Sequence, residues 1–216
     1  MFEAKEKGLP QFSNEHVVHR STTPDRHLEA LVLNNLPREV LGLVSNFISD
    51  GMMQESKLMD RSPEWVSGKL IKGEGIVVVM KSEDEDVPWD DDARLADFLV
   101  NHYAACAFLE KRLGVMSGVD IVEICGVYTN SSLRRNAHQS GPKIGAGTEA
   151  FATAIMRARQ VFPETAIVSW VHPMGSLQAL TNAVGGIDHL RLVPDEEFVG
   201  HEDILDPEHK PYEVIE

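Results

Sequence analysis

The stretch that decides the fold class is Val119–Thr148, which reads VDIVEICGVYTNSSLRRNAHQSGPKIGAGT. Residues 119–128 are mostly apolar, which predicts a buried strand whose interior holds one charged residue, Glu123. A polar loop follows and ends in two glycines, Gly145 and Gly147, directly before a predicted helix over about 148–160. This order of strand, glycine-containing loop and helix indicates an α/β domain with a candidate ligand site at the loop.

The same alternation continues toward the C-terminus. TAIVSWVH at 165–172 predicts a second strand, and Ser176 begins a helix that closes at Gly185-Gly186. Residues 187–193 predict a final strand.

Upstream of Val119 the periodicity predicts mainly helices. Thr23-Pro24 and the stretch from Asn35 to Pro37 are typical helix starts, and Gly51 lies where the second helix should end. The remaining predicted elements are a helix from Ser62-Pro63, a strand over 73–81 and a helix over 93–113.

The composition is that of a soluble globular protein. The 216 residues fit one domain, which we place at 23–194 between an irregular arm at 1–22 and an acidic tail at 195–216. The net charge of −14 argues against a nucleic-acid binder and against an anionic membrane surface as partner. We expect Cys106 and Cys125 to be buried free thiols in a cytoplasmic protein, because neither a signal peptide nor a membrane span is recognisable.

The glycine loop over 141–148 is the clearest candidate for a binding site. Glycines allow close approach of a ligand, and a helix start presents free N–H groups that suit a phosphate or pyrophosphate. A plain connector between strand and helix is the alternative. A Walker loop is excluded because no lysine stands at the helix start. GAGTEA at 145–150 matches a variant of the dinucleotide fingerprint, but about a dozen loop residues separate it from the preceding strand.

The order of elements over 119–193 resembles the GNAT superfamily of acyl-CoA-dependent N-acyltransferases. The resemblance is carried by the strand with Glu123, the loop PKIGAGT at 142–148, the strand IVSWVHP at 167–173 and the ending LTNAVGG at 180–186. It implies an α/β (α+β) single domain, whose mixed and mostly antiparallel central sheet is flanked by helices. It also implies that the two strands splay to admit the pantetheine arm of the cofactor.

The resemblance further implies site residues. The cofactor, acetyl-CoA or another acyl-CoA acting as co-substrate, would be held by Lys143, Ile144, Gly145, Ala146, Gly147 and Thr148, with Arg134 and Arg135 on its phosphates. Glu123 is the candidate base that takes the proton of the acceptor amine, and His172 is the second candidate. The structural alternatives are a solvent-facing or arginine-paired carboxylate for Glu123 and a capping or surface histidine for His172. For Arg134 and Arg135 the alternative is a pair of exposed loop arginines.

Four features differ from the family pattern, and one of them is the length of the loop before Pro142. Pro142 stands where the family has Arg or Gln, and the helix after His172 has no tyrosine to protonate the leaving thiolate. The helix predicted over 93–113 takes the place of the hairpin strand that the family has after its preceding strand.

The resulting function is transfer of an acyl group, taken to be acetyl, to an amine on a small molecule or a protein. The acidic runs at 83–92 and 195–208 favour a cationic acceptor. No histidine pair has a recognisable zinc spacing, so we expect no metal. The alternatives are a non-catalytic protein that binds a partner through its acidic surface and, third, a nucleotide-binding α/β protein. The sequence leaves a homodimer open.

Overall fold

A computed structural model describes residues 17–23, 26–55, 61–82, 84–130, 145–173, 175–198 and 208–215. Its elements, in chain order, are β1 (Val17–Thr23), β2 (Arg26–Val32), α1 (Arg38–Glu55), α2 (Pro63–Ile71), β3 (Gly75–Lys81), α3 (Asp92–Asn101), β4 (Tyr103–Met116), β5 (Val119–Thr129), α4 (Ala146–Val161), β6 (Ala166–Val171), α5 (Ser176–Val184), η2 (Ile187–His189), β7 (Leu190–Leu192), η3 (Asp195–Phe198) and β8 (Lys210–Val214).

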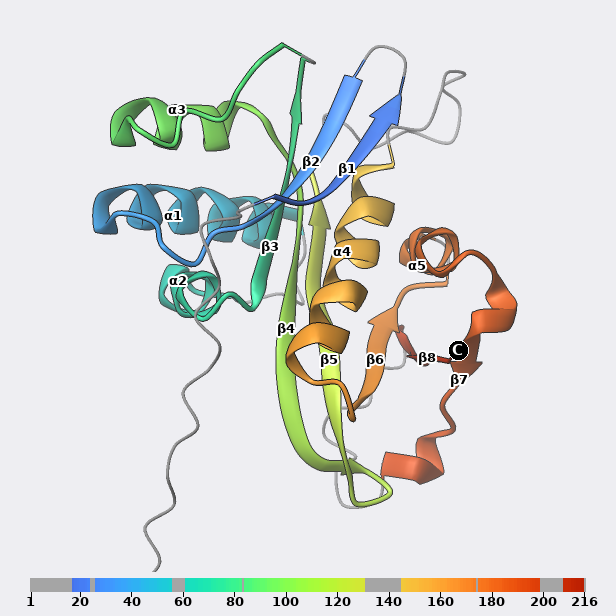
Figure 1. Cartoon of the computed structure of the whole chain (residues 1–216). Coiled ribbons are helices and arrows are strands. Elements are labelled where there is room, and N and C mark those ends of the chain that lie inside the picture. The colour runs from blue at the N-terminus through green and yellow to red at the C-terminus, as the bar shows by residue number, and fades with distance from the viewer. Residues whose placement is uncertain are drawn as a thin grey trace, which may run out of the picture.

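The strands form one eight-stranded sheet in the order β1-β2-β3-β4-β5-β6-β8-β7. Only the β5–β6 pair is parallel, and the other neighbours are antiparallel. Helices α1, α2 and α3 cover one face, while α4 and α5 cover the other (Figure 1). The predicted α/β domain with a mixed, mostly antiparallel sheet between helices is therefore confirmed.

Two buried clusters lie on the two faces of the sheet. On the α1–α3 face, Phe108 and Cys125 pack with residues of all three helices. On the α4 face, Val122 and Ile124 pack with Phe151. Alternate side chains of β5 are therefore buried on opposite faces of the sheet, which fixes the register of this strand.

The helices α2 and α3 begin as the sequence predicts or close to it. Ser62 caps α2, with its hydroxyl accepting from the Trp65 amide at 3.3 Å, and Pro63 follows as the first helical residue. Asp91 caps α3 by accepting from the Arg94 amide at 3.0 Å. The acidic run over 83–92 thus ends in a helix cap.

The helix predicted to follow Thr23-Pro24 is wrong, because residues 26–32 form strand β2. Leu28 packs toward α4, whereas Leu31 packs toward α1 on the opposite face. A strand that is buried on both faces carries apolar residues at spacings that imitate a helical stripe.

The helix predicted over 93–113 is wrong beyond Asn101. Residues 103–109 are buried on both faces of the sheet as the first half of β4, and Gly114 lies close to the turn of the β4–β5 hairpin with φ +63°. β4 pairs with β3 and β5, so the hairpin strand that appeared to be missing is present.

Helix α1 continues past Gly51, which the sequence analysis placed beyond the end of the helix. Met52 is fully buried, which keeps the last turn attached to the core. A Cβ at Gly51 would lie 3.3 Å from Cε1 of Tyr128. The glycine therefore accommodates this aromatic ring and does not stop the helix.

The two chain ends are more regular than predicted. Residues 17–22, expected in an irregular arm, belong to the edge strand β1. The expected acidic tail contains η3 and β8, and β8 lies inside the sheet between β6 and β7. The strand predicted over 187–193 is shorter, because 187–189 form the turn η2. The sheet thus extends beyond the predicted domain limits of 23–194.

Candidate active site

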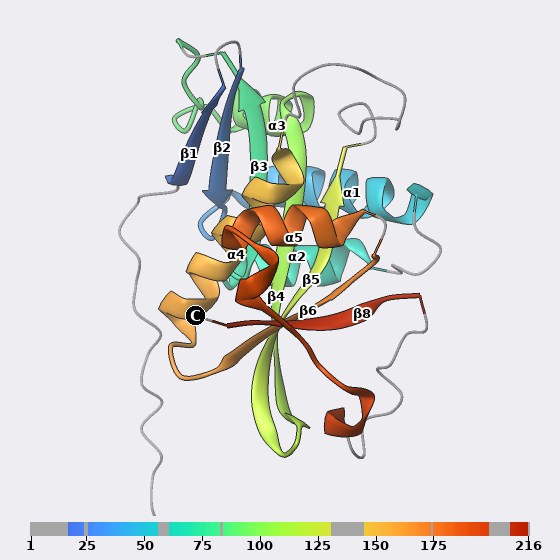
Figure 2. The ribbon, with the colours of Figure 1, turned by 90° about the vertical axis from the view of Figure 1, so that its right-hand side faces the viewer.

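Strands β5 and β6 form a fork. Their parallel ladder consists of three pairs, Ile121–Ala166, Val122–Ile167 and Glu123–Val168. One residue further, the Ser169 hydroxyl donates to the Ile124 carbonyl at 2.9 Å. Both strands continue beyond this point without further ladder pairs, and β6 and β8 cross β1–β4 at a large angle (Figure 2). The fork opens toward the carboxyl ends of the two strands.

A bulge bends β5 beside the fork. The register with β4 shifts between Cys106–Tyr128 and Phe108–Cys125, and Gly126 has φ +58°. A Cβ at Gly126 would lie 2.9 Å from Cδ2 of Phe108, so no larger residue fits without movement. Such bulges commonly redirect a strand next to a binding site.

The N-terminus of α4 lies at the open end of the fork. Gly145, with φ +75°, precedes the helix, and no side chain among the described residues caps the start of α4. A Cβ at Gly147 would lie 3.0 Å from Oγ1 of Thr129, the last residue of β5. Glu149 in the first turn is buried and accepts from the Thr153 hydroxyl at 3.5 Å, one turn further along. The uncapped amides of the first turn therefore suit an anion.

Four of the predicted cofactor-binding residues begin this helix, namely Gly145, Ala146, Gly147 and Thr148. The other four, Arg134, Arg135, Lys143 and Ile144, lie outside the described residues.

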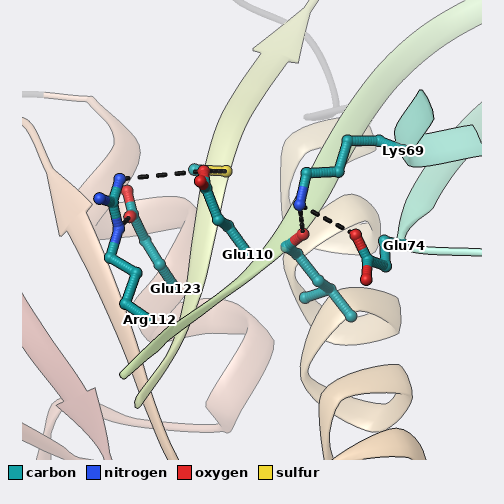
Figure 3. A network of polar contacts seen from close by, with 7 residues as sticks. Lys69, Glu74, Glu110, Arg112 and Glu123 are labelled. Atoms are coloured by element: carbon teal, nitrogen blue, oxygen red, sulfur yellow. Dashed lines mark hydrogen bonds and ion pairs between the residues drawn. The ribbon is translucent and has the colours of Figure 1, made fainter. Parts of the chain in front are cut away.

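Glu123 lies at the base of the fork in a network of charges (Figure 3). Its carboxylate accepts from Nε of Arg112 on β4, and it is 9% exposed. Glu110 is the cross-strand partner of Glu123, and its Oε2 is 3.8 Å from Nη2 of the same arginine. One guanidinium thus holds two carboxylates side by side.

Burial dominates the pKa values of this network. Desolvation raises the pKa of Glu123, although the charge and hydrogen bond of Arg112 act in the opposite direction. Burial also raises the pKa of the Cys125 thiol, whose Sγ is 3.9 Å from Oε2 of Glu110. Cys125 and Cys106 are buried free thiols, as predicted, and burial raises the pKa of Cys106 to about 12.

We predict that Arg112→Gln costs about 1–3 kcal/mol of stability, because it leaves a buried carboxylate without its cation. The pKa of Glu123 in the folded state is already raised above its ordinary value of 4.5, and the variant raises it further. Stability linked to such a group is present below the unfolded pKa and is lost as pH rises through the folded pKa. The loss of Tm should therefore be greater at pH 8 than at pH 5.

The matched control for this prediction is Lys111→Gln. Lys111 pairs with Asp120 at 3.1 Å, but the two side chains are 41% and 42% exposed. This variant should cost less than about 1 kcal/mol. An Arg112→Gln deficit that is equal at pH 5 and pH 8 would show that the ionisation of Glu123 is not coupled to Arg112.

His172, the second candidate base, is not part of this network. It follows β6 four residues beyond Val168, the partner of Glu123, which is roughly 13 Å along a strand. Its backbone amide donates to the Ser176 hydroxyl at 2.7 Å, and its ring lies 5.7 Å from that of His209 between centroids. The structure therefore separates the two predicted catalytic residues.

Several residues of the network escaped the sequence analysis. Glu110 and Arg112 were assigned to a helix, so their common face on β4 was not recognised. Lys69 of α2 contacts the same strand, donating to Glu74 at 2.9 Å and to the Leu109 carbonyl at 2.6 Å (Figure 3). Arg61 also approaches this face by stacking on Trp65.

Metal chemistry has no obvious site in the part of the chain that the structure describes, where no three His, Cys, Asp or Glu side chains gather to hold an ion. None of the described helices is long and apolar enough to cross a membrane.

Comparison with known proteins supports the fold. A putative arylalkylamine N-acetyltransferase from the yellow fever mosquito matches with a TM-score of 0.52 and 11% sequence identity, over 92% of this chain and 94% of that one. The chain has the GNAT fold. A GNAT-family acetyltransferase from Bacillus anthracis matches with a TM-score of 0.48 and 11% identity, over 92% and 98% of the two chains. No protein-family model matches the sequence, and no curated protein matches it significantly.

The GNAT fold accounts for the arrangement of the helices and strands. For the architecture, it confirms the resemblance that was predicted from the sequence. The fork between β5 and β6 and the N-terminus of α4 occupy the places at which the resemblance put the pantetheine arm and the phosphate loop.

Proposed function

We propose that this protein is an acyl-CoA-dependent N-acyltransferase, with acetyl the simplest acyl group and an amine as the acceptor. The observation that carries the proposal is that the fork leads from an uncapped helix start to a buried carboxylate. The N-terminus of α4 meets the open end of the fork beside Thr129, and Glu123 lies at its base.

The described residues fit acyl-CoA. The amides at the start of α4, which no described side chain caps, suit a pyrophosphate, and Gly147 lets this helix start approach Thr129 closely, because a Cβ would lie 3.0 Å from its Oγ1. Beyond Glu123–Val168 the facing edges of β5 and β6 form no further ladder pairs with each other, and an extended, amide-containing chain can hydrogen-bond along such an edge. Gly126 bends the strand along this path.

Acyl transfer requires the acceptor nitrogen to be unprotonated when it attacks the thioester carbonyl. A C–N bond then forms, the C–S bond breaks, and the products are an amide and the CoA thiol. Glu123 accepts the proton that the amine loses, and its raised pKa brings it closer to a useful range for a base. Water supplies the proton of the thiol in this proposal, since no tyrosine lies on α5.

A second candidate is a non-catalytic protein on the same fold. The observation that favours it is the ion pair between Arg112 and Glu123, because an arginine-bound carboxylate also has a purely structural use.

The experiment that separates the two is an acetyl-transfer assay with a panel of primary amines. Thiol release should require both acetyl-CoA and an amine, and mass spectrometry should find the acetylated amine. No thiol release above the protein-free rate with the whole panel would favour the non-catalytic alternative, whereas release at the same rate without any amine would show thioester hydrolysis and contradict N-acyl transfer.

A further inference from the structure

Arg61 lies on the same face of the sheet as Glu123, and no described carboxylate forms an ion pair with it. Its guanidinium carbon lies 4.5 Å above the centroid of the Trp65 ring. Its Nε is buried, and none of the described residues forms a hydrogen bond with it. Among the residues that the structure describes, no ion pair reaches this guanidinium, although it has five N–H donors.

The neighbouring cations, in contrast, are paired. Lys69 binds Glu74 at 2.9 Å, and Arg112 binds both Glu110 and Glu123. The Glu110–Arg112–Glu123 group therefore has one excess negative charge, and Arg61 has one excess positive charge. The site thus presents two separate centres of opposite charge.

A short series of contacts connects Arg61 with the base of the fork. Trp65 packs edge-on against Phe108, with ring centroids 5.0 Å apart. Phe108 is in turn the cross-strand partner of Cys125, two residues from Glu123. Arg61 is near enough for its charge to act on both Glu123 and Cys125. The two charged centres therefore belong to one site.

The anion that Arg61 would bind is not the cofactor phosphate. Helix α4 lies on the opposite face of the sheet from α2 (Figure 1). Arg61 stacks on Trp65 of α2 and so lies on the α2 face. A molecule that reaches Glu123 from the α1–α2 face would therefore share that face with Arg61.

We propose that Arg61 binds a carboxylate of the acceptor, so that the substrate is an amine that also carries a carboxylate, such as an amino acid. This inference rests on the proposed acyl transfer. The ammonium group matches the excess charge at Glu110 and Glu123, and the carboxylate matches the planar guanidinium. A phosphate with two charges fits less well, because the two glutamates repel it more strongly.

The test compares pairs of amines that differ only in the carboxylate, L-phenylalanine against 2-phenylethylamine and L-lysine against 1,5-diaminopentane. The wild-type protein should favour the carboxylate-bearing member of at least one pair in kcat/KM. Arg61→Gln should raise KM for that member by about tenfold or more, with little change for its partner. Arg61→Lys should recover part of the loss.

Two measurements make the outcome decisive. Stabilisation by acetyl-CoA should be unchanged in Arg61→Gln, which shows that the variant folds and that its defect concerns the acceptor. Lys72→Gln removes an exposed cation just after α2 and should behave as wild type. If the wild-type protein acetylates the amines without a carboxylate equally well, or if Arg61→Gln leaves its preference unchanged, Arg61 is not the carboxylate site while acyl transfer stands. If no amine is acetylated at all, both proposals fail.

Discussion

Glu123→Gln is expected to lower kcat by about 100-fold or more while the affinity for CoA stays nearly constant. The amide keeps the shape of the side chain and can accept from Arg112, but it cannot take up the proton of the acceptor amine. Steady-state kinetics with the best amine of the panel measures kcat, and calorimetry measures CoA binding.

The pH profile adds a second readout for the same variant. In the wild-type protein kcat should fall on the acid side as Glu123 becomes protonated, at a pH above its ordinary pKa of 4.5 because burial raises it. The variant should lack this acid limb. Glu29→Gln is the matched control, since Glu29 is also a buried strand carboxylate, 3.4 Å from a lysine, Lys81. Wild-type kcat in Glu123→Gln from pH 6 to 9 would mean that Glu123 is structural.

Gly147→Asp is expected to weaken CoA binding by at least about 100-fold. The added carboxylate would place a negative charge at the helix start proposed for the pyrophosphate, and like charges in such a site repel strongly. Its Cβ would also lie 3.0 Å from Oγ1 of Thr129, which narrows the same space. Calorimetric titration with CoA measures the loss.

Two control variants separate the effect of the added charge from the effect of the added volume and from a general loss of folding. Gly147→Ala introduces the same Cβ without the charge, so its loss of affinity should be smaller. Gly42→Asp places the same charge on α1, where nothing lies within 4 Å of an added Cβ, and should bind CoA normally. Unchanged affinity in a folded Gly147→Asp protein would remove the cofactor from this loop.

The sequence predicted the second half of the fold well because its elements have distinct periods and clear ends. β5, α4, β6 and α5 lie within a few residues of their predicted positions, and Gly185 ends α5 in the left-handed conformation. Glycines and caps act locally, so such boundaries are visible without tertiary information.

The prediction of the first half of the fold failed where strands are buried on both faces, because such strands lack the alternation of polar and apolar residues. β2 and the start of β4 are buried on both sides, so Leu28, Leu31 and the run 103–109 imitate helical stripes. Glu123 was found as the one charge inside a strand, but its partner Arg112 was not. Their pairing depends on the register of β4 against β5, which no local pattern records.

The central claim, that the fork and the start of α4 hold an acyl-CoA, is tested most directly by thermal unfolding of the wild-type protein with increasing acetyl-CoA. At a hundred times the dissociation constant the ligand should add about 2.7 kcal/mol of stability. For a chain of this size that corresponds to a rise in Tm of roughly 5–10 °C. A Tm that does not change up to millimolar acetyl-CoA would contradict the account.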